Sequence, residues 1–395
     1  MINQILKYLF ISHFDFTIWR FKIPLLKRLI HEGHQVFVTC PPGDVSDKFS
    51  TVGIQYIPLR LIRDNKNPLF EIQTIIHIRQ IINELSPDLI HTFTVRPNLY
   101  GSWANRLLRQ SIPIVNSVMG LGTLYTDYNG NTKSIKHEVM NRLYKWSFAK
   151  SKKVIFLNHD DLNIFLEDKI IRNSQADLIR GEGINIQFFH PVDFQAKIEL
   201  KKILNIHENK ILILLVARLI REKGILEFCQ AARILKEKYK DNVHFVVIGD
   251  IDRGNPSHLS WDDLNEFRQS SIVQFTGHLD EPQPFFAASD IYCLPSYREG
   301  LPVTIMEAMS SGLPVITTDS PGCRETIDNG VSGFLVPVRD VNALINKLEQ
   351  LILNPDLRIQ MGRAGRVKAE REFAVEKIVE QHMKLYEEVL NSKKV

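Results

Sequence analysis

Short apolar runs alternate with longer amphipathic stretches along most of the chain. In the first half, the apolar runs have the length and the β-branched and aromatic content of buried strands. They are KYLFIS, QVFVTC, IQYIPL, DLIHTF, IPIVNSV and KVIFLN. Between them lie segments with helical spacing, such as IPLLKRLIHEG and LFEIQTIIHIRQIINEL. This alternation predicts a parallel sheet with helices on both faces.

The second half repeats the same scheme. Its predicted strands are KILILLVAR, HFVVIGD, IVQFTG, DIYCLPS, LPVITTD and GFLVP. Because 395 residues exceed what one hydrophobic core usually supports, we expect two domains. The predicted fold class is α/β, with two Rossmann-like, doubly wound domains facing a cleft. The domains cover residues 1–188 and 189–375, with a linker near 190–208 and a terminal helix, 376–395, that packs back toward the first domain.

Composition excludes several kinds of protein. No apolar run approaches the roughly 18 residues of a membrane span, and the first residues resemble a strand more than a signal peptide. The four cysteines are scattered, without a C-x-x-C pair, so we expect a reducing compartment and neither disulfides nor a zinc site. Residues 1–185 carry 23 Lys and Arg against 16 Asp and Glu, a net charge of +7, whereas the remainder carries 26 against 29. A basic first half predicts an anionic partner.

Two glutamates flank a predicted turn in REGLPVTIMEAM. Glu299 follows the predicted strand DIYCLPS, and Pro302 suits the first turn of a helix that runs to Gly312. A carboxylate just ahead of a helix N-terminus either caps the helix or lies in a ligand site. Glu307 falls roughly 7–8 Å further along the helix, at about 1.5 Å per residue. The pair is therefore placed to hold two ends of an elongated ligand or, more simply, to cap a helix and face solvent.

Two cations follow the very apolar strand in LLVARLIREKG. Arg218 ends the strand, and Lys223 comes five residues later, just before Gly224 and a helical stretch. Arg offers forked donors and Lys a point charge, so the two are suited to bind a diphosphate beyond the strand end. The alternative is a solvated basic turn.

Taken together, these residues resemble the retaining glycosyltransferases of family 4, which have the two-Rossmann GT-B fold. The resemblance covers nearly the whole chain. It rests on Arg218, Lys223 and the E-x7-E spacing of Glu299 and Glu307, and on the ordered segments GEGINIQFFHP, FTGHLDE, AASDIYCLPSYREGLPVTIMEAMSSGLPVI and GVSGFLVP. The first-half segments HTFTVRPNLYGSWA and VNSVMGLGTLYTD resemble the branch that elongates lipid-linked oligosaccharides.

The resemblance implies a role for each matching residue. Arg218 and Lys223 would hold the diphosphate of a nucleotide-sugar donor, with uracil as the expected base. They would act catalytically together with Glu299, which contacts the donor sugar. Glu307 would bind the ribose hydroxyls, since a carboxylate accepts well from a vicinal diol. The remaining donor-binding positions are Gly300, Leu301 and Pro302.

Two departures from the family pattern concern the acceptor side. Many members carry a Gly-Gly pair after the first strand and a His after the fifth. Here the first loop reads SHFDFTIWRF, and Met119 stands in VMGLG where that His is often found. The candidates for acceptor contact lie near predicted strand ends or in the following loops: His13, His91, Arg96 and Asp127. Each also has a simple structural alternative.

Metal and cofactor sites receive little support. Asp250 and Asp252 form a D-x-D that could hold a metal ion in a metal-dependent transferase, but the matching family has a plain loop there. We therefore expect no metal. The Gly-rich dinucleotide fingerprint is absent, which disfavours a dehydrogenase. The nucleotide sugar is expected as a substrate, with no cofactor and no nucleic-acid partner.

The expected activity is sugar transfer to a polyprenyl-diphosphate-linked saccharide in surface polysaccharide or glycan assembly. Two other functions stay open. A sugar-nucleotide epimerase can share this fold, and it would release a changed nucleotide sugar without an acceptor. A non-catalytic partner subunit could also keep the fold, although such a chain usually loses part of the site, whereas this one retains all of it.

One segment predicts membrane contact. Residues 133–153, KSIKHEVMNRLYKWSFAKSKK, are rich in Lys and Arg and contain one acidic residue, Glu138. Basic amphipathic helices with aromatic residues lie at membrane interfaces. We therefore expect peripheral attachment to the inner face of the cell membrane, with a crossover helix packed on the sheet as the alternative. Apolar residues recur on one side at helical spacing: Ile135, Val139, Leu143 and Trp146.

Overall fold

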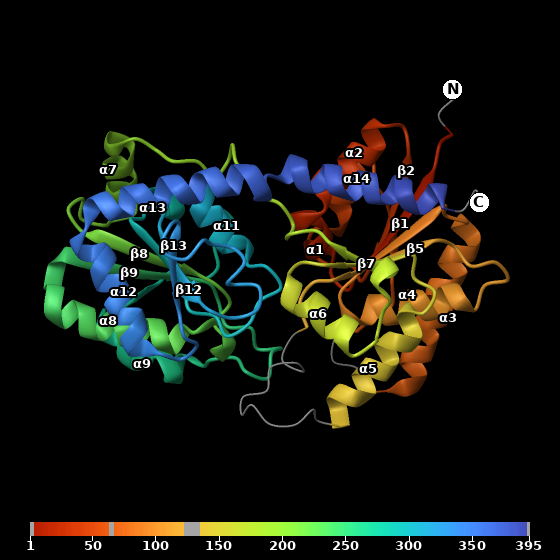
Figure 1. The fold of residues 1–395 in the computed structure, drawn as a ribbon, viewed down its shortest axis with the longest axis horizontal. Helices are drawn as coiled ribbons and strands as arrows, with labels where there is room; N and C mark the ends of the chain where they lie inside the picture. Colours follow the sequence, from red (N-terminus) through yellow and green to blue (C-terminus); the bar gives the residue numbers. More distant parts are fainter. Residues whose placement is uncertain (1–3, 63–66, 122–134, 393–395) are drawn as a thin grey trace. The chain divides into compact units, whose positions relative to one another are not determined.

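The chain folds into two compact units (Figure 1). The computed structural model describes residues 4–62, 67–121 and 135–392. The first unit comprises residues 1–183 and 376–395, and the second comprises residues 184–375.

Among the described residues, the first unit has a seven-stranded sheet with the order β3-β2-β1-β4-β5-β6-β7, and its paired strands are all parallel. All six strands predicted in the first half are present. The short edge strand β7 was not predicted, because its sequence ADL contains no apolar run. The strands are β1 (Lys7–Ile11), β2 (Gln35–Cys40), β3 (Gln55–Pro58), β4 (Leu89–Phe93), β5 (Ile114–Val118), β6 (Lys153–Phe156) and β7 (Ala176–Leu178).

Helices cover both faces of this sheet, because right-handed crossovers change face where the strand order reverses after β3. One face carries α1 (Asp15–Phe21), α2 (Ile23–His31) and the terminal helix α14 (Val375–Asn391). Two 3-10 helices lie in the described part of this unit, η1 (Ser46–Val52) and η3 (Asn173–Gln175). The opposite layer consists of α3 (Pro68–Leu85), α4 (Val95–Arg106), α5 (Ile135–Phe148) and α6 (His159–Glu167), with α4 packed between α3 and α5.

The second unit has a six-stranded parallel sheet within the described ranges, with the order β10-β9-β8-β11-β12-β13. The strands are β8 (Ile211–Val216), β9 (Val243–Ile248), β10 (Gln274–Phe275), β11 (Ile291–Leu294), β12 (Val315–Thr318) and β13 (Gly333–Val336). The predicted α/β class with two parallel sheets is therefore confirmed.

The helices of the second unit also lie on both faces of its sheet. One layer contains α8 (Ile225–Tyr239), α9 (Trp261–Gln269) and α12 (Val341–Leu353). The other contains α7 (Phe194–Ile203), α10 (Gln283–Ala288), α11 (Val303–Ser310) and α13 (Pro355–Lys368). Short helical turns complete the unit: η4 (Arg221–Lys223), η5 (Lys240–Asn242) and the π-helical η6 (Ala369–Phe373).

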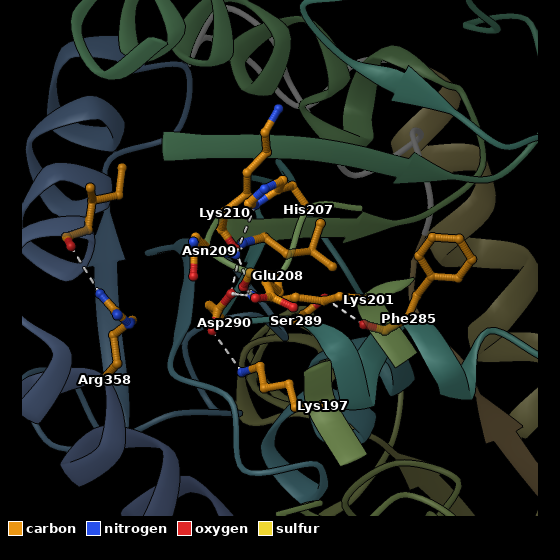
Figure 2. Close-up of polar contacts among 12 residues, drawn as sticks. Lys197, Lys201, His207, Glu208, Asn209, Lys210, Phe285, Ser289, Asp290 and Arg358 are labelled. Carbon is orange, nitrogen blue, oxygen red and sulfur yellow. Dashed lines mark hydrogen bonds and ion pairs between the residues drawn. The ribbon is translucent and has the colours of Figure 1, made fainter. Parts of the chain in front are cut away.

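The predicted linker at 190–208 is wrong, because this stretch contains α7. Asp193 caps the helix by accepting a hydrogen bond from the backbone N–H of Ala196 at 2.8 Å. Lys197 and Lys201 of α7 both pair with the carboxylate of Asp290, at 2.8 and 2.9 Å (Figure 2). The polar composition of this stretch suggested a linker, but it forms a helix whose lysines pair with Asp290.

Candidate active site

The carboxyl ends of β8 and β11 form the topological switch point of the second sheet. These strands are neighbours, but the chain continues from β8 toward one edge of the sheet and from β11 toward the other. Ligands of open α/β sheets bind in the crevice outside the strand ends at such a point. The run ILILLV of β8 is buried at its four central positions, and the polar residues begin where the strand ends.

Arg218 lies two residues beyond β8 and forms an ion pair. Its Nη1 donates to Oδ2 of Asp252 at 2.5 Å. The Arg218 side chain is 56% exposed, whereas that of Asp252 is 14% exposed. A guanidinium has five N–H donors, so this pairing leaves other donors of Arg218 for a ligand.

Lys223 and Glu299 form a second ion pair between the loops after β8 and β11. Nζ of Lys223 donates to Oε1 of Glu299 at 2.5 Å, and both side chains are largely shielded from solvent. The two loops come together because Gly224 has no side chain. A Cβ on Gly224 would lie 2.1 Å from the carbonyl oxygen of Pro295, and its φ of +69° also favours glycine.

The loop after β12 supports the backbone of Glu299. The N–H of Glu299 donates to the carbonyl of Pro321 at 3.0 Å. Gly322, with φ +76°, lies so close that a Cβ would be 2.4 Å from the carbonyl oxygen of Glu299 and 2.6 Å from that of Gly300. The Glu299–Gly300 turn is therefore held from behind, which leaves little freedom in its backbone.

Leu301 and Pro302 connect this turn to α11. Leu301 is buried, and Pro302 is the N-cap residue, one position before the first helical residue. Glu307 lies within α11 and is only 3% exposed, so the interpretation that it faces solvent is wrong. Burial, assisted by the negative charge of Glu307, raises the pKa of Tyr292 well above its ordinary value. The hydroxyl of Tyr292 donates to the carbonyl of Val216, at the end of β8, at 3.4 Å.

This edge of the sheet suits a ligand with phosphates and hydroxyls. Both α8 and α11 begin here, and unpaired N–H groups at helix N-termini favour anions. Arg218 and Lys223 add two positive charges, and Glu299 and Glu307 provide acceptors for hydroxyl groups.

The D-x-D carboxylates have other partners in the structure. Asp250 accepts a hydrogen bond from the backbone N–H of Ile251 at 2.7 Å, and Asp252 pairs with Arg218. Within residues 4–62, 67–121 and 135–392, no group of three or more His, Cys, Asp or Glu is arranged to hold a metal ion.

The first unit has its own switch point, between β1 and β4. His13 follows β1, and its Nδ1 lies 2.7 Å from the hydroxyl of Thr94, which follows β4. Thr94 has φ +70° and ψ 172°, a conformation otherwise nearly restricted to glycine. A β-branched residue held there marks this strand end as a candidate functional position.

His91 is placed differently from the other acceptor-side candidates. It is fully buried in β4, with Nδ1 2.6 Å from the hydroxyl of Tyr386 and Nε2 2.8 Å from that of Ser117. Burial, together with the charges of His382 and Lys22, lowers the pKa of His91 well below its ordinary value. The structure therefore gives His91 a role in joining α14 to the sheet.

Arg96 and Asp127 complete the acceptor-side candidates. Arg96, in the first turn of α4, donates to the carbonyl of Ile62 at 2.5 Å and lies 3.6 Å from the carboxylate of Glu71 on α3. Asp127 lies outside the described residues. The structure thus brings His13 to a strand end, places Arg96 beside α3 and buries His91.

Sequence reasoning missed two features of these sites. Asp252 attracted notice only as a metal ligand, because nothing in the sequence indicates that the loops after β8 and β9 bring it to Arg218. Thr94 was missed because a positive φ at threonine has no sequence signature; only the structure reveals it.

Two family models match the chain, one in each half. Residues 9–158 match the model described as "Glycosyl transferase 4-like", and residues 196–368 match "Glycosyl transferases group 1". The second match includes both ion pairs and Glu307, and the first includes His13 and Thr94.

Curated relatives match over much or nearly all of the chain. One is the N,N'-diacetylbacillosaminyl-diphospho-undecaprenol alpha-1,3-N-acetylgalactosaminyltransferase of Campylobacter jejuni, 29% identical over 97% of this chain and 99% of the relative. Another is an uncharacterized glycosyltransferase of Haemophilus influenzae, 31% identical over 63% of this chain and 69% of the relative.

A solved structure shares the fold. HepE from Anabaena, crystallised with UDP, superposes with a TM-score of 0.78 at 18% identity, covering 97% of this chain and all of that one. None of the helices in the described ranges combines the length and the apolar composition needed to cross a membrane.

Proposed function

The chain belongs to glycosyltransferase family 4, and on this premise we propose that it is a retaining, metal-independent enzyme acting on a lipid-linked saccharide. The donor is a nucleotide-diphosphate sugar, with UDP as the preferred nucleotide, carrying a hexose or an N-acetylhexosamine. The observation that carries this proposal is the grouping of Arg218, Lys223, Glu299 and buried Glu307 around one switch point.

Each of the four residues binds a particular part of the donor in this proposal. Arg218 and Lys223 bind the diphosphate, with the N-termini of α8 and α11 favouring the same charge. Glu307 accepts hydrogen bonds from the ribose hydroxyls. Glu299 contacts the sugar, and its ion pair with Lys223 keeps the sugar and diphosphate positions adjacent.

The proposed reaction is a front-side displacement. The acceptor hydroxyl oxygen forms a bond to the anomeric carbon on the face from which the diphosphate leaves. The bond from that carbon to the phosphate oxygen breaks, and the acceptor's proton passes to an oxygen of the leaving nucleoside diphosphate. Arg218 and Lys223 stabilise the negative charge that develops there, so no protein nucleophile is needed.

Metal independence follows from the same charges. Two cationic side chains at the diphosphate position perform the neutralisation that a divalent cation performs elsewhere. The pairing of Asp252 with Arg218 supports this proposal, because a carboxylate engaged by a guanidinium is a poor candidate for a metal ligand. The nucleotide sugar is a substrate, and we propose no cofactor.

The acceptor is a saccharide on a polyprenyl diphosphate. The name of the Campylobacter relative describes transfer to a diphospho-undecaprenol-linked sugar, and that relative matches nearly the full chain. His13 and Thr94, at the switch point of the first unit, are the proposed acceptor-side groups, with Arg96 nearby in sequence on α4.

An anionic membrane is the proposed partner of the first unit. The apolar residues predicted at helical spacing in α5 differ in exposure: Leu143 packs against the core, whereas Val139 and Trp146 are exposed. The side chain of Ile135 lies outside the described residues. Exposed apolar side chains also occur on α3 in the same layer, at Leu69, Ile72 and Ile76. Basic and apolar exposed residues together favour peripheral attachment at the inner face of the cell membrane.

A product analysis tests the proposal. The protein is incubated with labelled UDP-sugars, with and without a polyprenyl-diphosphate-linked saccharide. Acceptor-dependent label in the lipid fraction, with the donor's anomeric configuration kept, is the expected result. A changed nucleotide sugar formed without acceptor would identify an epimerase, and binding without turnover would indicate a non-catalytic subunit.

A further inference from the structure

The chain segments after β8 and β9 stay paired beyond the end of the sheet. The N–H of Ala217 donates to the carbonyl of Ile248 at 3.0 Å, and that of Leu219 donates to the carbonyl of Asp250 at 3.0 Å. Gly249 lies between them with φ +147°, and a Cβ there would be 1.8 Å from the carbonyl oxygen of Ala217. The two segments therefore approach one another more closely than a side chain at position 249 would permit.

The loop that follows is fixed on its other side as well. The N–H of Asn255 donates to the carbonyl of Asp252 at 2.8 Å, which closes a turn. The N–H of Arg221 donates to the carbonyl of Ser257 at 3.0 Å, which ties the same loop to the η4 segment. Asp252 thus has a fixed backbone and a side chain that is mostly shielded from solvent.

The two members of the Arg218–Asp252 pair differ in mobility. Arg218 is long and 56% exposed, and such a side chain has many accessible rotamers. Asp252 is short, 14% exposed and set on a fixed turn. The carboxylate therefore determines where the guanidinium lies.

We propose that Asp252 is a positioning residue, which holds the guanidinium of Arg218 in place for the donor's diphosphate. This inference rests on the proposed function. With one N–H group bound to Asp252, the remaining donors of Arg218 face a ligand without first having to be ordered. Because the leaving diphosphate gains negative charge during the reaction, correct placement of Arg218 matters most in the transition state.

The chain supplies a matched control for this role. Asp250 lies two residues away in the same loop, and its carboxylate binds the N–H of Ile251 rather than Arg218. Asp252→Asn and Asp250→Asn remove the same charge from the same loop. Only the first alters the group that holds Arg218.

The experiment measures donor kcat and KM for wild type, Asp252→Asn and Asp250→Asn, with thermal melting as the check on folding. We expect Asp252→Asn to lose about ten- to hundredfold in kcat/KM, the effect of one charged hydrogen bond, with most of the loss in kcat. The kcat/KM of Asp250→Asn stays within about twofold of the wild-type value. Asp252→Glu, which keeps the carboxylate, recovers part of the activity.

A double-mutant cycle with Arg218→Ala separates positioning from a general effect. In the Arg218→Ala background, Asp252→Asn has no further effect, because the residue it positions is absent. Equal activity of the two Asn variants, or the same loss with and without Arg218, overturns the inference.

Calorimetry with UDP separates this failure from that of the proposed function. If wild type binds UDP and transfers sugar while Asp252→Asn equals Asp250→Asn, the inference fails and the function stands. If wild type neither binds UDP nor uses any nucleotide sugar, the proposed function fails, and the inference that rests on it fails too.

Discussion

At the scale of single residues, the candidate site is a set of paired charges. Arg218 pairs with Asp252, and Lys223 pairs with Glu299. The sequence predicted Arg218, Lys223 and Glu299 from their positions after strands. It did not predict the ion pairs, because these depend on how closely the loops after the strands approach one another. Gly224 permits the close approach of the loops after β8 and β11.

Removing the side chains proposed to bind the donor's diphosphate and ribose should impair donor use without unfolding the protein. Arg218→Ala and the nearly isosteric Glu307→Gln should each lower donor kcat/KM by about ten- to hundredfold, as expected for about 1.5–3 kcal/mol per charged hydrogen bond. Steady-state kinetics and thermal melts provide the measurements. Arg221→Ala is the control, because Arg221 lies in the same loop but pairs with Asp263. Unchanged donor kinetics in both variants would remove these roles.

The cysteines should be unreactive in the folded protein. All four are buried, and burial, with the nearby charge of Glu299, raises the pKa of Cys323 to about 11. Burial also raises the pKa values of Cys40, Cys229 and Cys293. A raised pKa keeps the thiol protonated at pH 8, and the thiolate is the reactive form. A colorimetric thiol titration at pH 8 should find no rapidly reacting thiol before denaturant and all four after it; rapid labelling of the native protein would contradict the structure.

At the scale of elements, the sequence predicted those whose apolar pattern is strong. The buried strands β8 and β11 and the helix α3 follow such patterns directly. It failed for β7, which has three residues and no apolar run, and for α7, whose one buried residue is Lys201. In both cases tertiary contacts, rather than local pattern, determine the structure.

The paired charges of Asp290, Lys197 and Lys201, here called the Asp290 cluster, should be essential for the stability of the second unit. Asp290→Asn leaves Lys201, which is buried, and Lys197 without their counter-charge. Breaking one partner of a buried pair costs about 3–5 kcal/mol, so urea unfolding should show a loss of that size. Asp241→Asn is the control, since Asp241 is exposed and pairs with Lys210, and it should cost less than about 1 kcal/mol. Equal stability of the two variants would show that the cluster does not anchor α7.

The same cluster has a defined pH dependence. Burial alone would raise the pKa of Asp290, but Lys197 and Lys201 outweigh it and lower the pKa. A carboxyl group with a lowered native pKa stabilises the fold above the unfolded value of about 3.9, and this contribution is lost as the pH falls toward the native pKa. The free energy of unfolding of wild type should therefore exceed that of Asp290→Asn at neutral pH, and this difference should shrink only in acid.

The layer formed by α3, α4 and α5 should carry the membrane contact. Lys145, Lys150 and Lys152 are exposed, whereas Lys153 pairs with Asp177, so the first three are the residues to change. Reversing all three to Glu should markedly reduce sedimentation with anionic liposomes at low salt, at about 1 kcal/mol for each lysine removed. Binding by wild type should also fall as salt rises.

A matched triple variant controls for net charge. Lys27 on α2 and Lys377 and Lys384 on α14 lie on the opposite layer of the same unit and are also exposed. Their reversal to Glu makes the same change in total charge and should leave liposome binding largely intact. Equal loss in both variants would show that total charge, not this layer, governs binding.

At the scale of the whole molecule, the sequence predicted two parallel α/β sheets because the strand–helix alternation occurs twice. It also predicted that chemistry would lie beyond strand ends, where Arg218 and Glu299 are found. The acceptor side was less predictable. Of its candidates, His91 is a core residue in the structure, while Thr94, with its strained backbone, was not among them.

The central claim is that this chain transfers a sugar from a nucleotide diphosphate by means of protein cations. Its most direct test is transfer of label from a UDP-sugar to a polyprenyl-diphosphate-linked saccharide in the presence of EDTA. Label should enter the lipid fraction at an undiminished rate, with the donor's anomeric configuration, and only when acceptor is present. Complete loss of transfer in EDTA, restored by Mn²⁺, would contradict the account. Asp250 and Asp252 would then be the candidate metal ligands.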